Sequence, residues 1–240
     1  HLVDNMSITD SPRYLRYNGL PLVGIWGMGF TDRPGTIENC ETIIEFFKNN
    51  PETKYRATLM GGVPTYWRTG VNDSKSGYSG VYASFDVISP WTVGRYKYDS
   101  EVDSFRTSLV EPDLALTGSR GQDYMPVCFP GFSWANIMEN SALLNQIPRR
   151  GGNLLWRQVY NWLDAGCDSL YVAMFDEVDE GTSIYKVLPT QDDLPSTGLF
   201  LPLNADGETL PSDWYLRLTG EAGKALRGEI PLTTQRPIDP

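Results

Sequence analysis

The densest group of reactive side chains is an acidic run at residues 176–180, which reads Asp-Glu-Val-Asp-Glu. Four carboxylates fall within five positions, and no basic residue lies nearer than Lys186. Mutual repulsion raises the pKa of some crowded carboxyl groups, which suits a general acid beside an ionised partner. Glu177 and Glu180 are three residues apart, so a helical turn at this point would place both on one side.

Cleavage of a glycosidic bond needs two such groups, because one carboxyl protonates the leaving oxygen and a second acts as base or nucleophile. Two plainer interpretations fit the same pattern: a Ca²⁺ site, since Ca²⁺ prefers clustered carboxylates, or a solvated acidic loop. The full pattern of an EF-hand loop is absent. The catalytic interpretation names Glu177 and Glu180 as the catalytic pair and Asp176 as a substrate contact.

Several other chemistries are excluded by residue type. The chain has one histidine, His1, which argues against Ser-His-Asp and Cys-His catalysis and against a histidine metal site. The three cysteines, Cys40, Cys128 and Cys167, form no CxxC pair and allow at most one disulfide, and we expect all three to be packing residues. Neither GxGxxG after a strand nor GxxxxGK[ST] occurs. We therefore expect no cofactor and no metal.

Charge and hydropathy restrict the partners and the compartment. The net charge is −10 with no basic block, so nucleic acid and anionic membranes are not expected partners. No run of 18 apolar residues could span a bilayer. Glycosylation triplets begin at Asn5 and Asn72, which predicts a secreted, extracellular glycoprotein. A mature secreted chain would have lost its signal peptide.

Short apolar runs alternate with helical patterns along the chain. Continuous apolar runs suit strands buried on both faces of a parallel sheet, and a final short strand is predicted at 199–203. The strand runs are 20–26, 56–60, 85–89, 125–129 and 170–175. Helical spacing predicts helices from about 37 to 48, from 152 to 165, and after Ser212, whose side chain would cap a helix that stops at Gly228.

This alternation predicts an α/β fold, either a doubly wound sheet or a (β/α)₈ TIM barrel. The absence of nucleotide-binding motifs favours the barrel. A barrel has eight strands, and five or six are counted here. We therefore predict that residues 1–240 form a single glycosidase barrel domain, made of the C-terminal five or six β/α units and a C-terminal helix. The missing N-terminal part of the same barrel would then be a partner of this chain.

Aromatic residues recur just past the apolar runs. Trp26, Trp91 and Trp134 follow successive predicted strands, and Asn136 lies beside the last of them. The carboxyl ends of barrel strands carry the active site, so these residues are predicted to form a sugar-stacking platform. Each tryptophan taken alone fits a core position better, and it is their recurrence just past the apolar runs that favours the sugar-stacking interpretation.

Several longer motifs resemble the glycoside hydrolase family 71/99-like proteins. This group includes the endo-α-mannosidases and members labelled xylosidase or arabinosidase. The likeness covers most of residues 14–190, and its motifs follow in the same order. They are YNGLPLVGIWG at 17–27, ISPWTVGR at 88–95, PGFSWAN at 130–136, Pro148-Arg149 followed by Gly152, Trp156 and Gln158, and E-x-x-E-G-T at Glu177, Glu180, Gly181 and Thr182.

The resemblance implies a (β/α)₈ barrel of retaining α-glycosidases that use the substrate's own 2-hydroxyl, an exception to the usual two-carboxylate scheme. By motif position, Glu177 would be the base on that hydroxyl and Glu180 the acid/base. Val178-Asp179 replaces the Trp-His that separates the glutamates in the endo-α-mannosidases. The expected function is hydrolysis of a polysaccharide or glycan. The alternatives are a non-catalytic carbohydrate-binding protein and a Ca²⁺-stabilised extracellular structural protein on the same scaffold.

Overall fold

The computed structural model describes residues 1–240, which divide into two compact units. The first unit comprises residues 1–91 and 113–125, and the second comprises residues 92–112 and 126–240. No helix is long and apolar enough to cross a membrane.

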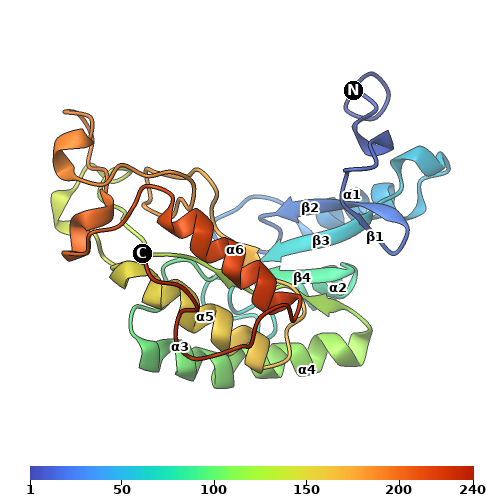
Figure 1. Cartoon of the computed structure of the whole chain (residues 1–240). Helices are drawn as coiled ribbons and strands as arrows, with labels where there is room; N and C mark the ends of the chain where they lie inside the picture. The colour runs from blue at the N-terminus through green and yellow to red at the C-terminus, as the bar shows by residue number, and fades with distance from the viewer. The chain divides into compact units, whose positions relative to one another are not determined.

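The first unit is built on a five-stranded sheet in the order β1-β2-β3-β4-β5 (Figure 1). β1 pairs antiparallel with β2, and all the other pairs are parallel. The strands are β1 (Arg16–Tyr17), β2 (Leu20–Trp26), β3 (Thr58–Val63), β4 (Val87–Pro90) and β5 (Asp123–Tyr124). The predicted α/β class is confirmed, whereas closure into an eight-stranded barrel stays a prediction.

The predicted strands of this unit agree with the structure in place but not in detail. β2 has the predicted bounds, but several of its side chains are exposed, so the expected burial on both faces is wrong for it. β3 and β4 begin two residues later than predicted. Ala57 and Phe85 are buried core residues that precede the paired segments, so hydrophobicity alone set the predicted start too early.

Three helices accompany this sheet: α1 (Ile37–Asn49), α2 (Ser79–Ala83) and α4 (Glu111–Arg120), the last belonging to this unit from residue 113 onward. α1 begins at a capping box, because the Asn39 amide donates to the Thr36 hydroxyl and the Asn39 side chain accepts from the Thr36 amide. Cys40 and Ile44 form its buried face. The helix ends before Pro51, as predicted.

The first unit contains one buried polar cluster centred on Asp113. The Trp67 indole donates to Asp113 Oδ2 at 2.8 Å, and Arg68 Nε donates to Oδ1 at 2.6 Å. The Tyr124 hydroxyl lies 3.5 Å from the same carboxylate. Asp113 is buried, so these donors replace the water that its charge would otherwise hold.

The second unit contains a two-stranded parallel sheet of β6 (Val127–Cys128) and β7 (Tyr171–Val172). Its helices are α3 (Asp99–Phe105), the π-helical turn η3 (Arg106–Val110), α5 (Asn153–Asp164) and α6 (Trp214–Leu226). α6 lies alongside α5 (Figure 1). The two predicted strands at 125–129 and 170–175 are present but shorter, and the helix predicted from 152 to 165 is α5.

Aromatic side chains from α5 and α6 fill the core of the second unit. Trp156, Trp162 and Trp214 are fully buried. Gln158 of α5 ties the chain after β6 to this core, because its amide accepts from Phe129 N at 3.0 Å and donates to Phe129 O at 2.8 Å. The backbone that follows β6 is therefore fixed in both of its hydrogen-bonding groups.

Two sequence predictions near the C-terminus are wrong. Residues 199–203 form no strand. Leu203 instead begins a short 3₁₀ helix, and its amide donates to the carbonyl of Leu188, which belongs to no strand. Ser212 does not cap α6, because the N-cap is Asp213, and the Ser212 carbonyl accepts from Val187 N instead. Gly228 does end the helix, with φ of +70°.

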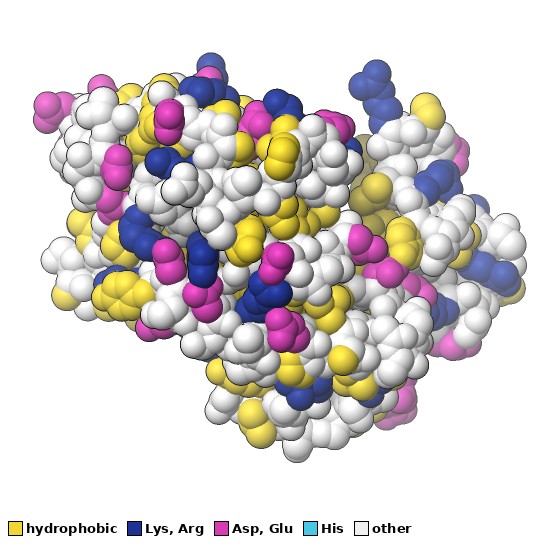
Figure 2. Space-filling view, turned by 60° about the horizontal axis from the view of Figure 1, so that its bottom comes forward, with side chains coloured by type: hydrophobic (Ala, Val, Ile, Leu, Met, Phe, Trp, Pro, Cys, Tyr) yellow, Lys and Arg dark blue, Asp and Glu magenta, His cyan; other side chains and the backbone are white.

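The connections include six 3₁₀ helices, and the long segment between β7 and α6 contains two of them. These six are Ile8–Asp10, Thr53–Tyr55, Ser141–Leu143, Arg150–Gly152, Gln191–Asp193 and Leu203–Asp206. The three cysteines are free and buried, in agreement with their predicted packing role. On the face shown in Figure 2, Lys and Arg side chains are interspersed with Asp and Glu side chains.

Candidate active site

The acidic run lies four residues beyond β7 and forms a tight turn rather than a helix. The turn is closed by Gly181 N, which donates to Val178 O at 3.2 Å. The Glu177 carbonyl accepts from both Thr182 N at 3.2 Å and Ser183 N at 3.1 Å. The backbone thus folds back on itself between Glu177 and Ser183, with Glu177 at the start of the reversal and Glu180 midway along it.

Glu177 is oriented by its own turn. The Thr182 hydroxyl donates to Glu177 Oε2 at 2.9 Å, and Thr182 itself is fully buried. A carboxylate held by a buried donor loses few further degrees of freedom when a substrate binds. Glu177 is only partly exposed, so its carboxylate is positioned before any ligand arrives.

Glu180 lies in a different electrostatic environment. Burial raises the pKa of its carboxyl to about 7, and the negative charges of Glu177 and Asp179 act in the same direction. Its backbone carbonyl accepts from Ser133 N at 2.7 Å, which fixes the backbone of the turn at Glu180. A carboxyl group with a pKa near 7 can both donate and accept a proton near neutral pH.

A buried arginine holds the next residue of the turn. Arg149 donates to the Gly181 carbonyl from Nη2 at 2.7 Å and from Nε at 3.2 Å. Gly181 has φ of +66°, and a Cβ there would lie 3.0 Å from a methyl carbon of Leu201. Only glycine adopts this conformation freely at so close an approach. Contacts from Ser133 and Arg149 therefore fix the backbone of the turn, and the Thr182 hydroxyl holds the Glu177 carboxylate.

The predicted substrate contacts in this unit lie near the turn, with one difference. Trp134 follows Ser133 directly, and its ring is 46% exposed and lies 5.8 Å from that of Phe132. Asp176 is exposed at the start of the acidic run. The Asn136 amide oxygen, however, accepts from Leu199 N at 3.1 Å. That oxygen therefore attaches the segment around residue 199 to the Trp134 segment.

The other two predicted tryptophans belong to the first unit and contact each other. Trp26 is 46% exposed at the end of β2, and its ring lies 5.8 Å from that of Trp91 in an edge-on arrangement. Phe30 lies 4.6 Å from the Trp26 ring, and the Arg33 guanidinium lies 5.3 Å from its centroid. The indole passes over Gly62, where a Cβ would lie 2.3 Å from it. The glycine thus makes room for the exposed Trp26 ring at the carboxyl end of β2.

Sequence reasoning did not assign roles to Arg149 or Thr182. Both stood within recognised motifs, Thr182 as the last residue of E-x-x-E-G-T and Arg149 in the Pro148-Arg149 pair. The available signal for Arg149 was a charged residue between Pro and Gly residues, which does not reveal burial. In neither unit do three or more His, Cys, Asp or Glu side chains gather into a group that could hold a metal ion.

The raised pKa of Glu180 predicts a measurable effect on stability. The folded state holds this proton more tightly than the unfolded state, whose carboxyl has an ordinary pKa near 4.5. Stability is therefore lost as the pH rises from about 4.5 through about 7. We expect Glu180→Gln to stabilise the protein at pH 8 by about 1–2 kcal/mol, after allowance for partial solvent screening, and to change nothing at pH 4.

Urea denaturation of both proteins at pH 4 and pH 8 measures this difference. Asp192→Asn, in an exposed 3₁₀ helix, provides the matched control and should show no pH-dependent gain. An equal effect of Glu180→Gln at both pH values would contradict the environment described for Glu180.

No family model matches the sequence, and no curated protein matches it. The solved structures that match include two of a glycoside hydrolase family 99 endo-α-mannosidase from Bacteroides thetaiotaomicron, one in complex with bis-tris-propane. The TM-scores are 0.67 for the complex and 0.68 for the other, with 15% and 16% sequence identity. The chain has a glycoside hydrolase 71/99-like fold. The matches cover 95% of this chain but 63% and 60% of the two endo-α-mannosidase chains. This chain therefore spans less than two thirds of their length.

Proposed function

We propose that this chain belongs to a glycoside hydrolase and supplies both catalytic carboxyl groups, Glu177 and Glu180. One observation carries the proposal: a partly buried carboxyl with a pKa near 7 shares a rigid turn with a second carboxylate held by a buried hydroxyl. Two neighbouring carboxyl groups in unlike environments take the acid and base roles separately. The shared fold with family 99 structures supports the assignment.

In the first step, Glu177 removes the proton from the 2-hydroxyl of the bound sugar. The resulting oxygen attacks the anomeric carbon, and the bond from that carbon to the leaving oxygen breaks. Glu180 gives its proton to the leaving oxygen, so the aglycone departs neutral. The product of this step is a 1,2-anhydro sugar, and no bond to the protein forms.

In the second step, Glu180 accepts a proton from water, and the water oxygen attacks the anomeric carbon. The bond between that carbon and the 2-oxygen breaks, and the oxygen takes back its proton from Glu177. Both carboxyl groups return to their starting states. Two inversions at one carbon give net retention, which is the stereochemical outcome that we propose.

The proposed substrate is a polysaccharide or glycan, and the proposed scaffold is a (β/α)₈ barrel completed by strands outside this chain. Exposed Trp26 and Trp134 are the proposed sugar-stacking surfaces, because aromatic faces pack well against apolar ring faces. Val178-Asp179 and the single histidine at position 1 leave the sugar itself open.

The test is to incubate the full-length protein with a panel of plant, fungal and host glycans and to follow the anomeric protons by NMR. The proposal predicts release of a sugar whose first-formed anomer has the configuration of the substrate. First-formed product of inverted configuration would reject the two-step route. Binding of a glycan without any cleavage over days would favour the second candidate, a carbohydrate-binding protein, which the exposed tryptophans also support.

We also propose that the protein is secreted and carries N-linked glycans at Asn5 and Asn72. Both side chains are exposed. Mass spectrometry of the protein isolated from its own source should find hexose-containing additions on the peptides with these two residues. Unmodified peptides at both positions in secreted material would reject the glycan assignment.

A further inference from the structure

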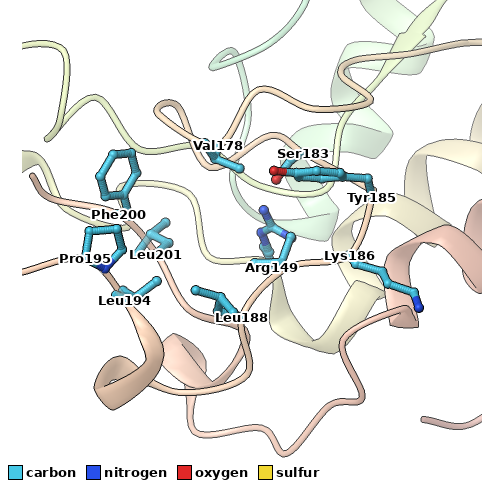
Figure 3. A pocket seen from close by; sticks show the side chains of 11 residues that line it. Arg149, Val178, Ser183, Tyr185, Lys186, Leu188, Leu194, Pro195, Phe200 and Leu201 are labelled. Carbon is cyan, nitrogen blue, oxygen red and sulfur yellow. The ribbon is translucent and has the colours of Figure 1, made fainter.

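A cavity of about 230 Å³ lies in the second unit beside the acidic turn (Figure 3). Val178, in the middle of that turn, forms part of its wall, whereas Glu177 and Glu180 do not line it. The cavity therefore adjoins the proposed catalytic carboxyl groups without containing them.

Arg149 projects a buried and incompletely bonded guanidinium into this cavity. The residue is only 5% exposed, and while Nε and Nη2 donate to the Gly181 carbonyl, Nη1 has no partner. No carboxylate forms an ion pair with it. Asp206, whose charge does act on Arg149, has its oxygens engaged by Asn145 Nδ2 and Arg150 N. The Tyr215 ring lies 4.7 Å from the guanidinium and offsets part of the cost of burying its charge. A buried cation without a bonded anion is still costly, so the site favours a negatively charged ligand.

A second unpartnered polar group lines the same cavity. Ser183 is 1% exposed, and its hydroxyl has no hydrogen-bond partner. In Figure 3 the hydroxyl oxygens of Ser183 and Tyr185 lie at the side of the cavity toward which the Arg149 guanidinium extends. One unpartnered N–H donor and one unpartnered O–H donor thus belong to residues in the wall of one cavity, and a carboxylate offers two oxygens to such a pair.

Apart from Lys186, whose side chain extends away from the cavity in Figure 3, the rest of the wall is apolar. Leu194, Pro195, Phe200 and Leu201 gather at the end of the cavity away from Ser183 (Figure 3). This surface offers no donor or acceptor side chain to the hydroxyl groups of a sugar, and burying them there would be unfavourable. It instead suits a hydrocarbon or aromatic body.

We propose that this cavity binds a small organic monocarboxylate with an apolar body, the carboxylate on Arg149 and Ser183 and the body against Phe200 and Leu194. Burial lowers the pKa of Arg149 because it disfavours the charged form, and a bound anion would stabilise that form. The binding does not depend on glycoside cleavage. It places a small-molecule ligand against Val178, within the turn that carries Glu177 and Glu180.

Calorimetric titration of the full-length protein with phenylacetate, 3-phenylpropionate and isovalerate tests the proposal, with phenylacetamide as the neutral analogue of the same shape. We expect at least one carboxylate to bind, and phenylacetamide to bind at least about tenfold more weakly than phenylacetate, since hydrogen bonds to a charged group discriminate by that much. Ser183→Ala should weaken phenylacetate binding about three- to tenfold, and Arg149→Met should abolish it.

Arg149 also anchors Gly181, so Arg149→Met can fail to fold. Ser183→Ala and Phe200→Ala keep the proposal falsifiable in that case, and circular dichroism verifies their folding. Leu216→Ala, an exposed change on α6, is the control that should leave the affinity unaltered. Absence of binding by all three acids below 10 mM (about −2.7 kcal/mol) would overturn the proposal. Equal affinity for phenylacetate and phenylacetamide, or an affinity unchanged by Ser183→Ala, would also overturn it.

Discussion

Glu177→Gln should abolish turnover of every glycoside, whereas Glu180→Gln should spare substrates whose leaving group needs no proton. Without Glu177 the 2-hydroxyl is not activated, whatever the aglycone. Without an acid at Glu180, a natural glycan loses the contribution of general acid catalysis, about 10³-fold in kcat/KM. The aglycone of a dinitrophenyl glycoside departs as the stable dinitrophenolate anion and needs no proton. The first step on this substrate should therefore slow by less than about tenfold in the Glu180→Gln variant.

Steady-state kinetics of the two variants on both substrate types measure this contrast. Asp179→Asn is the matched control, because it removes a carboxylate of the same turn that has no assigned chemical role. We expect it to retain activity within about tenfold and to shift the alkaline limb of the pH profile to lower pH, since Asp179 helps to raise the pKa of Glu180. Equal losses for Glu177→Gln and Glu180→Gln on the dinitrophenyl glycoside would contradict the division of roles.

The largest expected loss of stability follows from removing Asp113. In Asp113→Ala, the buried Trp67 indole loses its acceptor and Arg68 loses the carboxylate 2.6 Å away. Removal of one partner from a buried charge pair typically costs about 3–5 kcal/mol. We expect a decrease of about that size in the free energy of unfolding, measured by urea denaturation at pH 7.

Two controls separate the buried cluster from charge removal in general. Asp113→Asn keeps an oxygen for the indole and should cost less than Asp113→Ala. Glu229→Ala breaks the pair between Glu229 and Arg227, whose two bonds measure 2.6 and 3.0 Å at an exposed site, and it should leave stability unchanged. A loss below about 1 kcal/mol in Asp113→Ala would show that the cluster is not a stabilising centre.

The parts of the fold that could be predicted from sequence are those with a local signal. α1 carries its capping residues, its apolar spacing and the proline that follows it, so its range was predictable. The helical stretch from Asp99 to Arg120 was missed, because Pro112 looks like a helix breaker within a polar sequence. In the structure Pro112 is the second residue of α4, directly after the π-helical turn η3, where a missing amide is tolerated.

The site shows the same division between local and long-range information. The acidic run after a strand was visible as residues 176–180, and its crowding indicated a raised pKa. Glu180 has a raised pKa, but burial is the larger cause and the charges of Glu177 and Asp179 add to it. The anchors of the turn were not visible, because Ser133 and Arg149 lie 30 to 50 positions earlier in the sequence. Their roles depend on backbone contacts, to the Glu180 carbonyl and the Gly181 carbonyl, that no side-chain pattern encodes.

The way the acidic turn is held also affects how this protein could diverge. Its fixed points, Ser133, Arg149 and Thr182, all lie outside the irregular stretch between residues 186 and 213. Insertions and substitutions in that stretch can therefore change which ligand the cavity binds, while Glu177 and Glu180 keep their geometry. Selection on the apolar part of the ligand and selection on reaction chemistry would then act on different positions, with Arg149 common to both.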